Sequence, residues 1–210
     1  MKISIAEGLY LIALDDEEGR LLAAAEKTIV SGIISAMVLE LHLLKKIKID
    51  LDGKMAVEDT TGTGNGILDN VLKKLKSGSE VIETVENLSH HFKDIQEDLN
   101  ELLVQRGILR KEATKLMWIP LSERMDNANY AFEQEIRNGM YAIVFKSAKP
   151  SAAFVVLMSL IYDCDILDEV FKDKDELIDA VKVAKDIINS PSVTPEVSKV
   201  LERLKKFFRG

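Results

Sequence analysis

The sequence predicts a mainly α-helical fold: a single globular helical domain over residues 1–210, built around a central hydrophobic helix with short peripheral β-hairpins. Apolar residues recur at helical spacing over most of the chain. One such stretch, residues 23–44, is apolar over more than a single stripe, as expected of a helix with neighbours on several sides. Two short stretches instead resemble strands around polar turns, which is typical of hairpins.

The bulk composition is that of an ordinary folded protein. The chain has 210 residues, enough for one sizeable hydrophobic core, so a single domain is expected. Apolar residues make up 47% and charged residues 30%, as in most globular proteins. Because aromatic residues account for only 6%, the core must consist mainly of aliphatic side chains.

The N-terminal part begins with a helix and continues into a hairpin. Ser4 and Glu7 have the spacing of a capping box, which predicts a short buried helix up to about Leu14. An acidic turn at residues 15–19 separates it from the long helix at 23–44. Alternating residues at 47–57 flank an Asp-Gly pair, which predicts a β-hairpin.

The remaining elements are predicted as follows. A glycine-rich loop at 60–66 leads to helices at about 67–76, 80–92 and 94–106, the last one ended by Gly107 in a left-handed cap. A second β-like segment covers 108–110 and 116–120, with a polar turn at 111–115 between them. Further helices are expected at 123–138, 151–162, 165–171, 174–188 and 194–208.

Charge and cysteine content restrict the classes of partner. The net charge is −7, which argues against a nucleic-acid partner, including a winged-helix mode of binding, because phosphate contacts rely on Lys and Arg. Cys164 is the only cysteine, so no internal disulfide or cysteine metal cluster can form, as is usual in a reducing compartment. The most apolar stretches, 28–44 and 152–162, are interrupted by charge or too short to span a bilayer. A cytoplasmic protein with at most a peripheral membrane role is expected.

Catalytic and metal-binding motifs are weak. His90 and His91, followed by Asp94 and Asp98, could suggest a metal-dependent hydrolase, but adjacent histidines on a helix point in different directions. A solvated helix face is the preferred interpretation, so neither a metal site nor a cofactor is expected. The loop at 60–66 could cradle a phosphate, yet it lacks the Lys-Ser/Thr ending of a P-loop, and a turn that starts the next helix is favoured. The sequence therefore predicts no catalytic residue and no enzymatic activity.

Two apolar or aromatic segments have a structural and a functional interpretation. Trp118, the only tryptophan, either covers the edge of the core or forms a finger at a bilayer interface, where tryptophan is favoured. The basic and aromatic residues at 204–209 are either a frayed helix end or a contact patch for a membrane or partner.

Several stretches taken together resemble one known family. They are residues 7–16 with Glu18-Gly19, Ser31-Gly32 with residues 39–43, the hairpin at 47–57, and residues 63–69, 103–109, 160–162 and 165–171. In this order they resemble the Golgi phosphoprotein 3 family, whose eukaryotic members are peripheral Golgi adaptors and which has prokaryotic relatives. The resemblance covers most of the chain.

The resemblance implies a fold and a function. The fold is mostly helical around a central hydrophobic helix. Eukaryotic members bind phosphatidylinositol 4-phosphate, insert a hydrophobic hairpin into the membrane and hold the tails of glycosyltransferases. By this resemblance the membrane-contacting hairpin corresponds to Leu116, Met117, Trp118 and Ile119.

The headgroup pocket of the family aligns with four positions of this chain. A tryptophan and an arginine of the pocket align with Ala25 and Ile34, and two arginines spaced by three align with Lys93 and Gln96. Lys93 alone keeps the charge, whereas a phosphomonoester needs several directed cationic donors. Lys93 and Gln96 are the headgroup candidates, and a weak preference for some anionic headgroup is expected.

The expected function is therefore a non-enzymatic peripheral membrane-binding or adaptor domain. Its partners would be an anionic lipid surface, phosphoinositides among the candidates, and a protein client. The alternative is a protein–protein interaction module of the same fold that does not bind lipid. The oligomeric state stays open.

Overall fold

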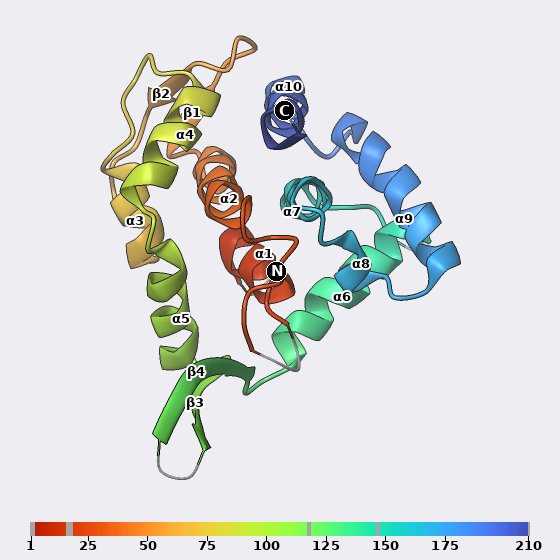
Figure 1. Cartoon of the computed structure of the whole chain (residues 1–210). Coiled ribbons are helices and arrows are strands. Elements are labelled where there is room, and N and C mark those ends of the chain that lie inside the picture. The colour runs from red at the N-terminus through yellow and green to blue at the C-terminus, as the bar shows by residue number, and fades with distance from the viewer. Residues whose placement is uncertain (1–2, 16–18, 117–118, 146–147, 210) are drawn as a thin grey trace.

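The computed structural model describes residues 3–15, 19–116, 119–145 and 148–209, and for residues 112–124 the backbone alone. The first half of the chain contains α1 (Ile5–Ile12), α2 (Ile29–Leu43), β1 (Ile47–Ile49), β2 (Met55–Val57), α3 (Gly66–Leu72), α4 (Val81–His91) and α5 (Ile95–Gln105). The second half contains β3 (Leu109–Leu116), β4 (Ile119–Asn127), α6 (Ala131–Val144), α7 (Ala152–Asp163), α8 (Leu167–Val170), α9 (Lys174–Asp186), the 3₁₀ turn η1 (Ile187–Asn189) and α10 (Pro195–Arg209). The predicted mainly helical fold with short hairpins is confirmed (Figure 1).

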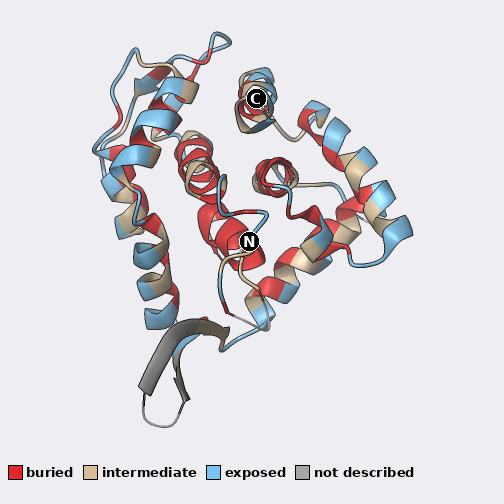
Figure 2. Cartoon of the chain, in the orientation of Figure 1, coloured by how far each residue is buried: buried red, intermediate tan, exposed pale blue. Residues whose placement is uncertain are grey.

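The central hydrophobic helix is α2, as predicted. It packs against α1, α3, α4 and α7, and these neighbours leave most of its surface buried (Figure 2). A Cβ atom added at Gly32 would lie 2.9 Å from Sγ of Cys164 and 3.0 Å from Cδ2 of Leu9. The close approach of the neighbouring chain segments therefore depends on a residue without a side chain at this position.

The predicted start of the central helix is wrong. Residues 23–28 form hydrogen-bonded turns, and α2 begins only at Ile29. Just before these turns, the backbone N–H of Leu22 donates to the carbonyl of Ala13, next to the antiparallel β-bridge between Leu14 and Leu21. Most side chains in residues 23–28 are exposed, so a helix there would gain little stability from apolar burial. The high helix propensity of the three alanines is not sufficient by itself.

Glu7 and Glu40 fix the first helix. The predicted capping box is present, because Ser4 Oγ accepts from the backbone of Glu7 and the Glu7 carboxylate accepts from the backbone of Ser4. Oε2 of Glu40, on α2, accepts from the N–H of Ile5 at 2.9 Å. Three N–H groups at the start of α1 that lack helical partners, those of Ser4, Ile5 and Glu7, are thereby satisfied.

Two antiparallel two-stranded sheets are present among the described residues. The predicted first hairpin is confirmed: Ile47 pairs with Val57 and Ile49 with Met55, and Gly53 in the turn has a φ of +78°. The second hairpin is much longer than predicted. β3 and β4 pair from Leu109 with Asn127 up to Leu116 with Ile119, so the expected turn at 111–115 is strand.

The longer hairpin also shifts α6. Residues 123–127, predicted as the start of a helix, belong to β4, and α6 begins at Ala131 and continues to Val144. The boundary is set by side-chain amides: Oδ1 of Asn127 accepts from the N–H of Asn129, and Oδ1 of Asn129 accepts from that of Ala131. Such Asx turns compete with regular secondary structure.

The C-terminal helices cover the other side of α7 (Figure 1). The predicted positions of α4, α5, α7 and α10 agree with the structure to within one residue, whereas α3, α8 and α9 end earlier than predicted. The basic and aromatic C-terminal segment is an ordered part of α10: Phe207 and Phe208 pack against the core, and the guanidinium of Arg209 lies 4.2 Å from the ring centre of Tyr162.

Candidate functional site

The hairpin formed by β3 and β4 extends away from the helices at one end of the molecule (Figure 1). Its base follows directly from α5, because Gly107 reverses the chain with a φ of +66°. Ile108 is fully buried, and its carbonyl accepts from the N–H groups of Ala128 and Asn129. Both ends of the hairpin are thus tied to one buried residue.

Polar side chains clamp the hairpin base to α1 and α6. Nη1 of Arg106 lies 2.6 Å from the buried carboxylate of Glu7 on α1. Nδ2 of Asn127, at the end of β4, donates to the buried carboxylate of Glu133 on α6 at 2.8 Å. Arg137 donates to the same Glu133 carboxylate at 2.7 Å. The base is therefore held by hydrogen bonds to charged groups, the stronger kind.

The turn after α1 also contacts the base of the hairpin. The N–H of Met125, on β4, donates to the carbonyl of Gly19 at 2.9 Å. Gly19 has a φ of +60°, and a Cβ atom there would lie 2.2 Å from the Met125 carbonyl oxygen. Only glycine allows this backbone approach.

A cleft of about 510 Å³ lies beside the hairpin base. Its walls come from α1, the turn at residues 19–21, the N-terminal two thirds of α5, and the two strands. The lining residues are Tyr10, Leu14, Gly19, Arg20, Leu21, Gln96, Glu97, Asn100, Glu101, Lys111 and Met125. This volume lies in the range of small-molecule sites.

Tyr10 and Asn100 join α1 to α5 within the cleft. The hydroxyl of Tyr10 donates to Oδ1 of Asn100 at 2.8 Å. Burial raises the pKa of the Tyr10 hydroxyl to about 12, so the phenol stays protonated at neutral pH and keeps this donor role. The Asn100 amide also carries an NH₂ group, which can only donate.

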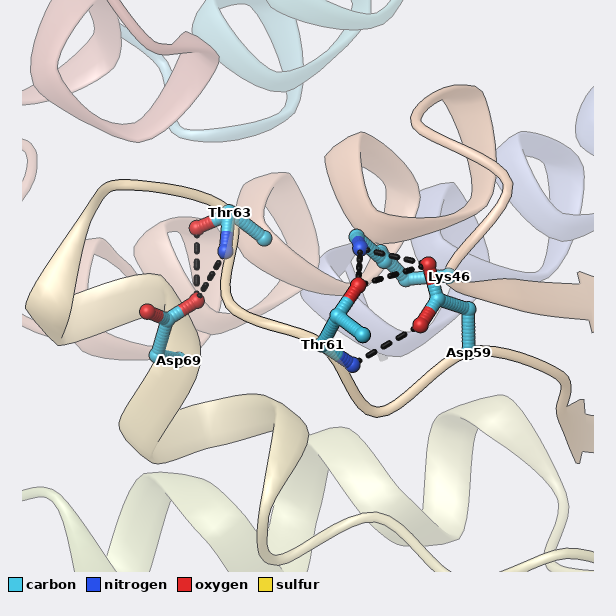
Figure 3. Close-up of polar contacts among 5 residues, drawn as sticks. All are labelled: Lys46, Asp59, Thr61, Thr63 and Asp69. Atoms are coloured by element: carbon cyan, nitrogen blue, oxygen red, sulfur yellow. Dashed lines mark hydrogen bonds and ion pairs between the residues drawn. The ribbon is translucent and has the colours of Figure 1, made fainter.

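The glycine-rich loop before α3 contains a second polar cluster, drawn in Figure 3. Nζ of Lys46 donates to Oδ2 of Asp59 at 2.6 Å and to Oγ1 of Thr61 at 2.7 Å. Oδ1 of Asp69 accepts from both the N–H and the hydroxyl of Thr63 at 2.7 Å. The hydrogen bond from Lys46 lowers the pKa of the Asp59 carboxyl to about 2. The hydrogen bonds from Thr63 likewise lower the pKa of the Asp69 carboxyl.

Several donors that a phosphate would need already have acceptors within the loop. Asn65 caps α3, its Oδ1 accepting from the N–H groups of Ile67 and Leu68. The carboxylates of Asp59 and Asp69 lie on either side of the loop and accept from its N–H groups. An incoming anion would compete with these groups and be repelled by the carboxylates. The loop is therefore a turn that starts the next helix, which was the favoured interpretation.

The histidines lie apart from the cleft. His90 and His91 end α4, and the ring of His91 packs edge-on against that of Phe92. His42, on α2, accepts from the N–H of Ile49, and burial lowers the pKa of its imidazole. Within the described part of the chain, no group of three or more His, Cys, Asp or Glu side chains could hold a metal ion.

A comparison with models of protein families shows to which family the chain belongs. The model described as Golgi phosphoprotein 3 (GPP34) matches residues 5–204. The chain belongs to the GPP34 family. No individual curated protein matched it.

Membership in the GPP34 family agrees with a lipid-binding or adaptor role in general terms. Of the two headgroup candidates, Gln96 lines the cleft, whereas Lys93 is exposed between α4 and α5 and is not part of the lining. Ala25 and Ile34, aligned with the other two pocket positions, are fully buried in the core. They offer no polar group to a ligand.

Two of the four predicted membrane-contacting residues, Leu116 and Ile119, lie at the far end of the hairpin. Leu116 and Ile119 pair with each other as the last residues of β3 and the first of β4. Met117 and Trp118 lie outside the described residues. Among those described, no helix is both long and apolar enough to cross a bilayer.

Most residues that line the cleft are not among the site residues predicted from the sequence. Glu97, Asn100 and Glu101 share one face of α5 with Gln96, a spacing that a helical projection could have shown. Arg20 and Lys111 come from a turn and a strand distant in sequence, so their approach to α5 becomes visible only in the folded chain.

Proposed function

We propose that this member of the GPP34 family is a non-enzymatic peripheral membrane-binding or adaptor domain on the cytoplasmic side of a membrane. The observation that supports it is the long hairpin, which extends beyond the helices and has a headgroup-sized cleft at its base. The sequence from Leu116, where β3 ends, to Ile119, where β4 begins, is apolar and contains the tryptophan favoured at bilayer interfaces.

The net charge of −7 restricts how the protein can approach an anionic membrane. A protein of this charge is not attracted to an anionic surface as a whole, so binding must come from one end of the molecule. In the proposed mode the tip enters the interface, and the cleft at the base meets a phospholipid headgroup.

Vesicle co-sedimentation tests this proposal. The parent protein, Trp118→Ala and a control, Phe145→Ala, are compared on neutral phosphatidylcholine vesicles and on vesicles that also contain anionic lipid. Phe145 is an exposed aromatic residue at the end of α6. We expect binding that requires anionic lipid and weakens roughly tenfold in Trp118→Ala, because its interfacial apolar area is lost.

Phe145→Ala should bind like the parent. The proposal fails if the parent protein stays in the supernatant with every vesicle composition, or if the two variants weaken equally.

The second candidate is a protein–protein interaction module without lipid binding. Two observations favour it: the acidic net charge, and the burial of Ala25 and Ile34 at positions where the family pocket has a tryptophan and an arginine. Affinity purification in the absence of membranes would then recover a defined partner whose binding is unaffected by Trp118→Ala.

A further inference from the structure

The cleft at the hairpin base has a mixed charge. Arg20 and Lys111 contribute two cations, and Glu97 and Glu101 contribute two carboxylates, so the formal charge of the described lining residues is zero. Glu97 and Glu101 lie one helical turn apart on α5 and therefore line the same wall.

We infer that this cleft binds a headgroup that carries a phosphate and a primary ammonium group together, as amino-phospholipids do. The inference rests on the proposed membrane function and specifies its ligand. It concerns the same cleft but names a ligand class different from the phosphorylated inositol that the family resemblance suggested.

The two carboxylates disfavour a phosphate-only ligand. A phosphomonoester carries close to two negative charges at neutral pH, and both Glu97 and Glu101 would repel it. Their repulsion offsets the attraction of Arg20 and Lys111. A ligand with one phosphodiester charge and one ammonium charge instead finds a group of opposite sign for each end.

The geometry of α5 supports the same assignment. An ammonium group has three donors and no acceptor, and carboxylates one turn apart provide acceptors at suitable spacing. Gln96 and Asn100, one helical turn apart, line the same wall, and their side-chain amides carry further donors for phosphate or carboxylate oxygens. The wall therefore offers acceptors and donors within a few residues.

Phosphatidylserine and phosphatidylglycerol provide a charge-matched test. Both carry one net negative charge, but only phosphatidylserine has an ammonium group. Co-sedimentation is measured on phosphatidylcholine vesicles with equal mole fractions of one or the other. We expect about threefold to tenfold tighter binding to phosphatidylserine, the size that one or two partly exposed ion pairs can give.

The double variant Glu97→Gln/Glu101→Gln separates specific recognition from general electrostatics. It should lose the preference for phosphatidylserine while binding phosphatidylglycerol at least as well as the parent. Glu86→Gln/Glu202→Gln, on exposed positions of α4 and α10, changes the net charge equally and should keep the preference.

Soluble sn-glycero-3-phosphoethanolamine carries one phosphodiester group and one ammonium group. Titrated by calorimetry, it tests a non-lipid source of the same chemistry. Calorimetric binding that is lost in the Glu97→Gln/Glu101→Gln variant, without any vesicle preference, assigns the cleft to a soluble aminophosphate. Equal binding to both anionic lipids, with no calorimetric signal, overturns the inference and leaves the membrane proposal intact. Absence of binding to all vesicles would instead overturn the membrane proposal.

Discussion

The carboxylate of Glu7 lies 2.6 Å from Nη1 of Arg106, and this pair ties the first helix to the residue at which α5 ends and the hairpin begins. Glu7 is almost completely buried, while the Arg106 side chain is about one third exposed. The same carboxylate accepts from the N–H of Ser4, so one buried charge connects a helix start, a helix end and the hairpin base.

Replacing Arg106 should destabilise the protein. In Arg106→Met the Glu7 carboxylate keeps its burial but loses its cationic partner, which lowers the free energy of unfolding by about 2–4 kcal/mol. Urea denaturation measures this. The control is Arg110→Met, whose more exposed pair with Asp126 should be worth less than about 1 kcal/mol. Equal losses in the two variants would contradict the role given to the Glu7–Arg106 pair.

The contact between Gly19 and Met125 can be tested with two glycine substitutions. Gly78 has a φ of +89° and open space around it, so Gly78→Ala should cost about 1 kcal/mol from backbone strain alone. Gly19→Ala adds a clash with the Met125 carbonyl and should cost about 1–3 kcal/mol more.

Hydrogen exchange provides a local readout for the same pair of variants. The Met125 amide donates to the Gly19 carbonyl and should exchange faster in Gly19→Ala only. Unchanged exchange at Met125 would show that the turn does not hold the hairpin base.

Glu40 should give the protein a pH-dependent stability. Burial raises the pKa of its carboxyl from 4.5 to about 7. Between these values the folded protein holds a proton that the unfolded chain has released, so the free energy of unfolding decreases as the pH rises from about 4.5 to 7.

Glu40→Gln removes this ionisation and keeps an oxygen acceptor for the N–H of Ile5. Compared with the parent, it should be more stable by about 1–3 kcal/mol at pH 8 and by much less at pH 5. Denaturation series at both pH values measure the difference, with the exposed Glu86→Gln as the control. A gain of the same size at pH 5 would refute the assignment.

Cys164 should be unreactive in the folded protein. Its thiol is fully buried, and burial raises its pKa to about 12, so very little thiolate forms at neutral pH. Ellman's reagent should label it only at the rate of unfolding. A Thr60→Cys variant, in which the added thiol is exposed, should gain one rapidly labelled group. Rapid labelling of the parent protein would contradict the burial.

Local sequence patterns were sufficient for much of the fold. The capping box at Ser4, the Asp-Gly turn before Lys54 and the left-handed Gly107 each depend on a few neighbouring residues, and each appears as predicted. The wide apolar surface of residues 23–44 likewise predicted a central helix, because a helix buried on several sides lacks a wide polar face, and residues 29–43 form it.

Segments stabilised by distant contacts were predicted less well. Residues 109–116 include lysine, glutamate and alanine, which are depleted in strands, and they are held by pairing with residues 119–127. Residues 123–127 look helical by propensity but belong to the same hairpin. The cleft depends on this hairpin for Lys111 and Met125, so its full lining could not be predicted from local pattern either.

Within the described part of the chain, β3 and β4 pair as strands only with each other. Each strand therefore has an outer edge without a partner strand, although the Met125 N–H on the edge of β4 donates to Gly19. Such edges can recruit strands from other molecules and lead to aggregation. Two features protect the distal part of this hairpin: the register shifts between Thr114 and Lys115, and Pro120 lacks the N–H that a third strand would need. Substitutions that straighten this irregularity, such as Pro120→Val, would therefore be expected to lower solubility even where they stabilise the hairpin itself.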